Sequence, residues 1–279
     1  METNVLRLVM ATIFLSAMLW ATTGHPYPAF AGWKAWLWLG LSALVGYVFG
    51  DFCLFNSYLC IGPRLGQLMM TIAPPMAAVA AWIMLGESMS WTSILAMAVT
   101  LCGIGMSILS RGEKHHLKLD IPFRGILLGI GAGTGQGVGL VLSKIGMEHY
   151  AAAVPADASA AIQAMLPFAS TLIRAIIGAV GFLILLSIGK GLGSLKAAVK
   201  DPKGMRYTAL LTIFGPALGV SLSLMAVRYA NAGIASTLMA LTPVIIIAPD
   251  VLINKHKIKT KEIIGVLVSV TGVAMFFLL

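Results

Sequence analysis

Charged residues are scarce in this sequence. Of its 279 residues only 10% are Asp, Glu, Lys or Arg, whereas 59% are hydrophobic. A soluble domain of this length could not cover its surface with so few charges, so the composition indicates a protein that crosses a membrane many times. The apolar runs also lack the period of two that a transmembrane β-barrel requires. The predicted fold class is therefore an all-α membrane protein.

Residues that carry out catalysis or bind metals are equally scarce. The three cysteines lie inside hydrophobic runs without a C-x-x-C pair, which is typical of packing residues. The five histidines are scattered in or beside loops, so no metal-ligand spacing is visible. No nucleophile motif or carboxylate pair is found either. The sequence therefore predicts no enzyme activity, no catalytic residue, no metal and no cofactor.

A glycine-rich stretch, Gly129–Gly139, places glycine at every second position. A phosphate-binding loop is excluded because the G-x-G-x-x-G spacing fails from every starting glycine and no Gly-Lys-Ser/Thr follows. In a helix, Gly125, Gly129, Gly133 and Gln136 share one face. Bare backbone there allows either close helix packing, with the Gln136 amide bonded to a neighbouring helix, or an open cavity in which Gln136 contacts a substrate.

Hydrophobic runs of membrane-spanning length occur nine times. A helix of roughly 20 apolar residues crosses the hydrocarbon core. The predicted helices lie near residues 4–22, 36–58, 65–85, 90–109, 123–145, 163–188, 207–228, 232–252 and 260–279.

The net charge is +9, and most charged residues lie in or beside the segments between these runs, which argues against a nucleic-acid partner. Most Lys and Arg fall in alternate loops, and the positive-inside rule places those loops in the cytoplasm. The prediction is a multi-pass protein of the inner (plasma) membrane with residue 1 inside and residue 279 outside. The loops predicted to be cytoplasmic are 111–122, 189–206 and 253–259, whose basic residues would also meet anionic lipid.

The sequence also repeats itself after a shift of about 168 residues. Thr3–Ala11 then lies over Ser170–Gly178, which aligns Arg7 with Arg174, and Arg64–Pro75 lies over Ala232–Pro243. A repeat of five helices, an odd number, must enter the membrane in opposite directions in its two copies. The predicted division is a first repeat at 1–110, a basic linker at 111–122 and a second repeat at 123–279.

The first copy holds only four of the five helices. The one without a counterpart is the glycine-rich helix at 123–145, and only six residues precede Arg7, whereas about ten helical residues precede Arg174. We therefore expect Met1 to be an internal methionine of a longer protein, or this form to lack its first span.

These features resemble the drug/metabolite transporter superfamily, specifically its EamA-type members with two five-helix repeats. The resemblance rests on short motifs spread over nearly the whole chain: Ala73–Pro75, Leu241–Pro243, Leu85–Glu87, Ala232–Ser236, and the glycines Gly103 and Gly272. It implies a secondary transporter for a small metabolite. Three features depart from the family: the absent first helix, Asn254–His256 in place of a Gly-Glu turn, and the predicted outside location of residue 279.

Asp51 is the strongest candidate for a role in transport, because it lies within a predicted membrane helix. A charge at that depth costs about 3 kcal/mol or more, so it should be paired, protonated or turned to the interior. The alternatives are a structural pair with Arg7, which lies in the same half of the membrane, a role in proton or substrate coupling, and a location near the inner headgroups.

Arg174 falls near the middle of its helix. It either attracts an anionic group such as a carboxylate or neutralises the dipole end of a neighbouring helix. Weaker candidates for the substrate pathway are Thr134, Gln67, Asn56 and Thr242, because polar residues of these types commonly bridge helices. The prolines that are expected to kink their helices are Pro74, Pro75 and Pro243.

The sequence thus predicts an EamA-type transporter that works by alternating access, with proton coupling through Asp51 as a hypothesis. The alternative is a non-transporting or incomplete membrane protein that acts as a subunit or scaffold. The expected partners are a small-molecule substrate and membrane lipid.

Overall fold

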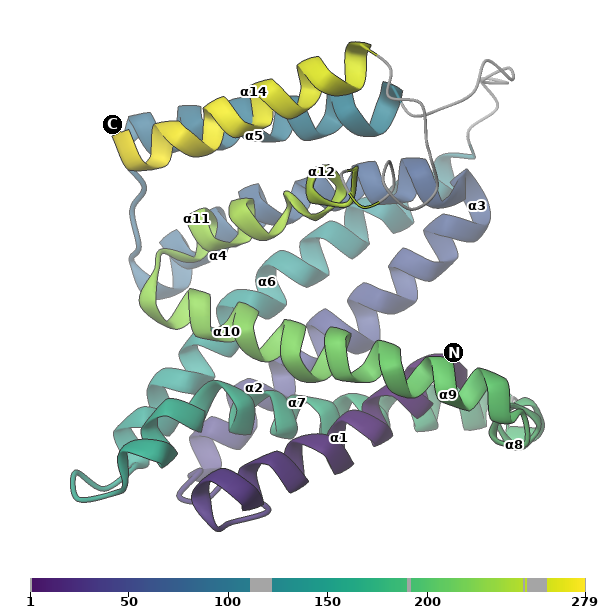
Figure 1. Cartoon of the computed structure of the whole chain (residues 1–279), viewed down its shortest axis with the longest axis vertical. Helices are drawn as coiled ribbons and strands as arrows, with labels where there is room; N and C mark the ends of the chain where they lie inside the picture. The colour runs from purple at the N-terminus through teal and green to yellow at the C-terminus, as the bar shows by residue number, and fades with distance from the viewer. Residues whose placement is uncertain (1, 111–121, 190–191, 248, 250–259, 279) are drawn as a thin grey trace. The chain divides into compact units, whose positions relative to one another are not determined.

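A computed structural model describes residues 2–110, 122–189, 192–247, 249 and 260–278. All the regular structure in this part of the chain is helical (Figure 1). The helices of the first repeat are α1 (Glu2–Thr23), α2 (Trp33–Ala43), the π-helix η1 (Leu44–Asp51), α3 (Phe52–Met69), the 3-10 turn η2 (Met70–Ile72), α4 (Ala73–Leu85) and α5 (Trp91–Ser110).

The second repeat begins with the glycine-rich helix. Its elements are α6 (Phe123–Ala153), α7 (Ala160–Ile188), α8 (Leu192–Val199), α9 (Pro202–Thr212), the π-helix η3 (Ile213–Gly219), α10 (Val220–Tyr229), α11 (Ala232–Met239), α12 (Thr242–Ile245) and α14 (Thr260–Leu278). Each of the nine predicted helices has a counterpart in the described chain. The all-α membrane fold is thereby confirmed.

Seven uninterrupted runs among the described residues are long and apolar enough to cross a membrane. One of them, Trp33–Leu85, contains 53 residues and holds two predicted helices. They meet at Gly62, whose φ of 80° and ψ of 158° break the helix directly before Pro63. The prediction of two helices is therefore right, although the first begins a few residues earlier and ends a few residues later than expected.

The chain forms two compact units, and each takes helices from both halves of the sequence. Unit 1 comprises residues 1–48 and 139–229, and unit 2 comprises residues 49–138 and 230–279. The predicted division at 111–122 concerns the two copies of the sequence repeat and stays a prediction. Most of this linker lies outside the described residues.

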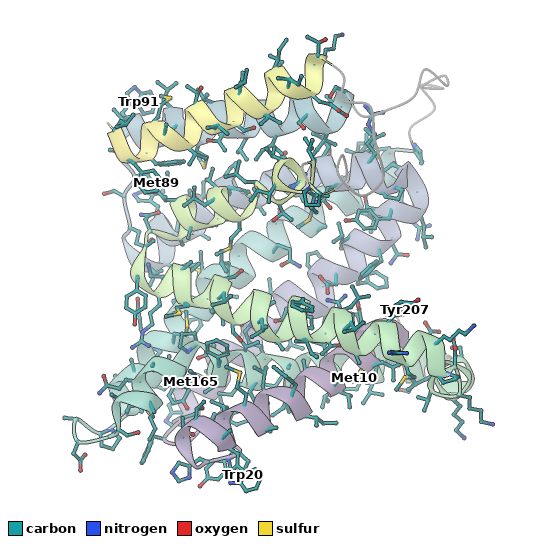
Figure 2. The ribbon with its side chains drawn as sticks, viewed as in Figure 1. Met10, Trp20, Met89, Trp91, Met165 and Tyr207 are labelled. Carbon is teal, nitrogen blue, oxygen red and sulfur yellow. The ribbon has the colours of Figure 1, made fainter. Side chains whose placement is uncertain are left out.

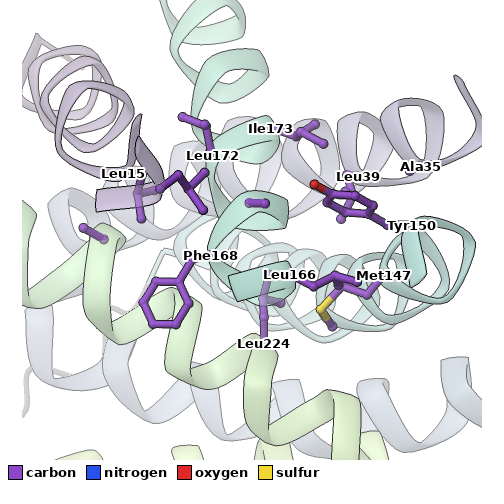
Figure 3. Close-up of a cluster of buried hydrophobic side chains, with 13 residues drawn as sticks. Leu15, Ala35, Leu39, Met147, Tyr150, Leu166, Phe168, Leu172, Ile173 and Leu224 are labelled. Atoms are coloured by element: carbon purple, nitrogen blue, oxygen red, sulfur yellow. The ribbon is translucent and has the colours of Figure 1, made fainter. Parts of the chain in front are cut away.

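In unit 1, α7 is the central helix and is buried on all sides from Leu166 to Ala175. The end of α1 clusters with the beginning of α7, as Leu19 does with Leu166, and the beginning of α1 with the end of α7. The two matched helices are therefore antiparallel. Figure 3 shows the cluster of apolar side chains around α7, which includes Leu15, Leu39, Met147, Phe168 and Leu224. Burial of these side chains favours tight packing by dispersion.

Unit 2 contains two further matched pairs. In the pair α5–α14, Gly265 lies against Ser107 and Gly272 against Thr100, so the helices run in opposite directions (Figure 1). In the pair α4–α11, Gly233 near the start of α11 lies against Ala78 in the middle of α4 and against Met89 just after its end. All three matched pairs are thus antiparallel, as an inverted repeat requires.

The repeat extends to an irregular feature. The π-helices η1 and η3 begin at Leu44 and Ile213, positions that the repeat shift aligns to within a residue. A π-helix accommodates an extra residue in a turn, and it is often found at functional sites.

Candidate functional site

Asp51 and Gln136 form a hydrogen-bonded pair in unit 2. Asp51 is the last residue of η1 and Gln136 belongs to α6, and both side chains are half-buried. The Gln136 Nε2 atom donates to Asp51 Oδ1 at 2.9 Å. Each residue was predicted separately, and the structure brings them together.

Glycines let α6 lie close to its neighbours beside this pair. A Cβ added to Gly133 would be 3.0 Å from the carbonyl oxygen of Met69, and one on Gly137 would be 2.8 Å from the amide nitrogen of Ala77. Because these atoms belong to backbone, no side-chain movement could make room. At these glycines the observed arrangement is close packing, one of the two alternatives that the sequence left open. Contact of Gln136 with a substrate stays a prediction, as does that of the half-buried Thr134.

The other polar candidates of unit 2 have local partners. Gln67 accepts a hydrogen bond at 2.8 Å from the hydroxyl of Tyr58, which sequence reasoning did not single out. The Asn56 amide donates to the carbonyl of Phe52, and the Thr242 hydroxyl donates to that of Met239. These two side chains bond to their own chain segments, as polar residues in helices commonly do.

The predicted kinks coincide with interruptions of the helices. Pro74 and Pro75 lie in the first turn of α4, directly after the 3-10 turn η2. Pro243 lies in the first turn of α12, after α11 has ended at Met239. Proline is tolerated at these positions because the first amide groups of a helix have no intrahelical acceptor.

Arg174 is the buried cation of unit 1. Its side chain is 4% exposed, and its guanidinium carbon lies 4.5 Å from the centre of the Tyr47 ring. The Nε atom has no hydrogen-bond partner among the described residues. Gly178, one turn after Arg174, leaves room for the ring, since an added Cβ would lie 2.9 Å from Tyr47 Cδ2.

Arg7 occupies the matched position in α1 but has different surroundings. Its guanidinium donates to the side chain of Asn4 at 3.2 Å. Arg7 belongs to unit 1 and Asp51 to unit 2, so the hypothetical Arg7–Asp51 pair stays a prediction.

Glu87 has a role that the sequence analysis did not identify. Its carboxylate accepts a hydrogen bond at 3.0 Å from the backbone amide of Ala232, the first residue of α11. Gly86 ends α4 in the left-handed conformation, with φ of 68°, and so directs the chain towards α11. The position of Glu87 next to this glycine was the available signal.

An apolar cavity of about 350 Å³ lies where α4 turns into α5 in unit 2. Figure 2 labels Met89, one of its lining residues, and Trp91 in the same corner. The carboxylate among the residues that line the cavity belongs to Glu87, which already caps α11. The cavity therefore offers few polar groups that could select a polar metabolite. Of the predicted site residues, Pro75 lines it.

Comparisons with known proteins agree with this arrangement. The model of the EamA-like transporter family matches residues 1–109 and 123–278. No curated protein matches the chain. A solved crystal structure is 16% identical, with a TM-score of 0.69, over 100% of this chain and 88% of the other. At this identity the similarity shows the fold.

Proposed function

The chain belongs to the EamA-like transporter family, and from this premise we propose that it is a proton-coupled secondary transporter of a small metabolite. The family suggests a transporter and not an enzyme, and the apolar helices make the chain a multi-pass membrane protein. In this proposal, access to the substrate alternates between the two sides of the membrane.

The hydrogen bond between Gln136 and Asp51 is the observation that carries proton coupling. A carboxylate at membrane depth is costly, and protonation removes most of that cost. A primary amide can serve both states, because its NH₂ group donates to a carboxylate and its oxygen accepts from a carboxylic acid. Asp51 can therefore gain and lose a proton while Gln136 remains its partner.

Irregular helices at matching positions support a change of shape during transport. The paired π-helices η1 and η3, and the interruptions before Pro74 and Pro243, are places where the backbone hydrogen-bond ladder is already altered. Bending there sacrifices fewer hydrogen bonds than bending a regular helix.

We propose that the protein lies in the inner membrane and that the basic ends of its units face the cytoplasm. In unit 1, Ser194 donates to Glu2, so the start of α1 and the basic segment after α7 lie at the same end. In unit 2, Arg64 donates to the carbonyl of Ile108, at the end where α14 begins and carries Lys261 in its first turn. The segments 111–121 and 253–259 lie outside the described residues.

The proposal can be tested with purified protein in liposomes that contain a pH-sensitive dye. Solutes from a panel of amino acids, nucleosides and organic acids and bases are added one at a time, with and without an imposed pH gradient. We expect at least one to move protons in the wild type, and Asp51→Asn to lose at least about 90% of this flux, since one essential proton carrier is removed. Asp157→Asn, the same change at an exposed loop residue, is the control.

Two results would contradict the proposal. Flux in Asp51→Asn with an unchanged pH dependence would exclude Asp51 as the proton carrier. Failure of every solute in a well-inserted wild-type protein would favour a subunit or scaffold that does not transport.

A further inference from the structure

We propose that Arg174 is an anion-binding residue and that the transported solute carries a single carboxylate. The inference rests on the proposed transport function, of which it names the substrate class. It starts from the central helix of unit 1, where α7 carries a guanidinium that is 4% exposed. A buried cation normally has a carboxylate partner or a set of hydrogen-bond acceptors.

Among its described residues, unit 1 has no carboxylate near the middle of α7. Its four acidic residues are Glu2, Glu148, Asp157 and Asp201. Glu2 begins α1 and accepts from Ser194, and the other three are exposed near helix ends. Arg174 is close to the middle of α7, half the helix length from either end. A cation–π contact with Tyr47 is worth about 2 kcal/mol when desolvated, which is less than the cost of burying a charge.

A second polar group lies on the same face of α7. Ser170 precedes Arg174 by four residues, so the two side chains are neighbours on the helix. The Ser170 hydroxyl is fully buried and has no hydrogen-bond partner among the described residues. By contrast, the next residue, Thr171, donates to the carbonyl of Pro167, the usual partner of a helical hydroxyl. Arg174 Nε and the Ser170 hydroxyl are therefore two buried donors on one face of α7 without a partner among the described residues.

These donors fit a carboxylate. The planar guanidinium can donate two parallel hydrogen bonds to its two oxygens, and the Ser170 hydroxyl can donate a third. One positive charge matches a monoanion, whereas a phosphate dianion would leave a net negative charge in the same low-dielectric surroundings. The apolar neighbours Leu172 and Ile173 offer no further cation. The site thus favours a monocarboxylate over a phosphate.

The test measures binding and not flux, so that its failure is distinguishable from that of the transport proposal. Purified protein is titrated with acetate, hexanoate and benzoate, with their uncharged amides as isosteres and with inorganic phosphate, and binding is followed by thermal shift and calorimetry. We expect at least one carboxylate to bind and its amide and phosphate not to. Arg174→Gln should weaken carboxylate binding at least about tenfold, and Arg174→Lys less, because it keeps the charge and loses the two-pronged geometry.

Stability separates this role from a structural one. If Arg174 serves an absent anion, Arg174→Met removes an uncompensated charge, and the melting temperature of the ligand-free protein should stay level or rise by about 2 °C or more. If Arg174 is there to hold Tyr47, the same variant should be less stable or fail to fold. Arg206→Gln, an equal charge change at an exposed position, is the control for both measurements.

The proposal is overturned by any of three outcomes. The first is that no carboxylate binds to the wild type. The second is that the amides or phosphate bind as tightly as the carboxylates. The third is that every Arg174 variant fails to fold.

Discussion

The Asp51–Gln136 pair couples a charged group to a single amide, and the energy of that coupling can be measured. Gln136→Leu leaves the half-buried carboxylate of Asp51 without one of its donors, which should reduce the unfolding free energy by about 1–3 kcal/mol. In the double variant with Asp51→Leu much of this loss should be recovered, because both polar partners are gone. Thermal unfolding in detergent of the four proteins gives the coupling energy. Additive losses would mean that the hydrogen bond contributes nothing to stability.

Glu87 should stabilise the start of α11 through its carboxylate. The negative charge lies next to the positive end of the helix dipole and accepts from the amide of Ala232. Glu87→Ala is expected to cost about 0.5–2 kcal/mol of stability, and Glu87→Gln less, because its oxygen can still accept. Ser88→Ala, the next residue and an exposed one, provides the control in the same melting experiment. Equal stability of Glu87→Ala and the wild type would show that the cap does not contribute to stability.

The pairing of α5 with α14 depends on small residues along both helices. A Cβ added to Gly103 would overlap with the backbone amide of Ser269, and one on Gly265 would lie 2.7 Å from that of Ser107. Helices in lipid associate by such close packing, so Gly103→Ala should force the pair apart and lower the melting temperature by at least about 4 °C. Gly105→Ala is the matched control on the same helix, since its Cβ would meet Leu68 at an ordinary 3.6 Å. Equal melting of the two variants would contradict this account.

Helices were predictable from the sequence, and irregularities within them were not. Length and hydrophobicity identify each span because the hydrocarbon core imposes both. The break at Gly62 left a signal in Gly62-Pro63, within a segment predicted only as the connection between two helices. The π-helices left none, because an extra residue in a turn does not change composition. Gln136 could be recognised as a candidate, whereas its bond to Asp51 requires knowledge of which helices are neighbours.

The repeat reveals which helices are alike but not which of them pack together. Each compact unit combines helices from both copies, so that α1 lies against α7 and α5 against α14. The sequence predicted antiparallel copies from the odd number of helices, and the pairs inside each unit run in opposite directions accordingly. That Arg174 has no carboxylate beside it among the described residues of unit 1 could not be predicted, because the acidic residues of unit 1 are identifiable only once its helices are assigned.

The orientation that we propose for the chain in the membrane rests on the distribution of its basic residues. Glu2 and Ser194 are hydrogen-bonded, so the amino end and the segment after α7 share a side, and their basic residues favour the cytoplasm. With nine predicted crossings, residue 279 is predicted to be outside. We expect green fluorescent protein to fluoresce in a bacterial host when fused after Lys200, and alkaline phosphatase to be active only when fused after residue 279, because each reporter matures on one side of the membrane. Phosphatase activity after Lys200, or fluorescence after residue 279, would mean that the charge bias does not set the orientation. The cytoplasmic assignment of the basic loops would then have to be reversed or abandoned.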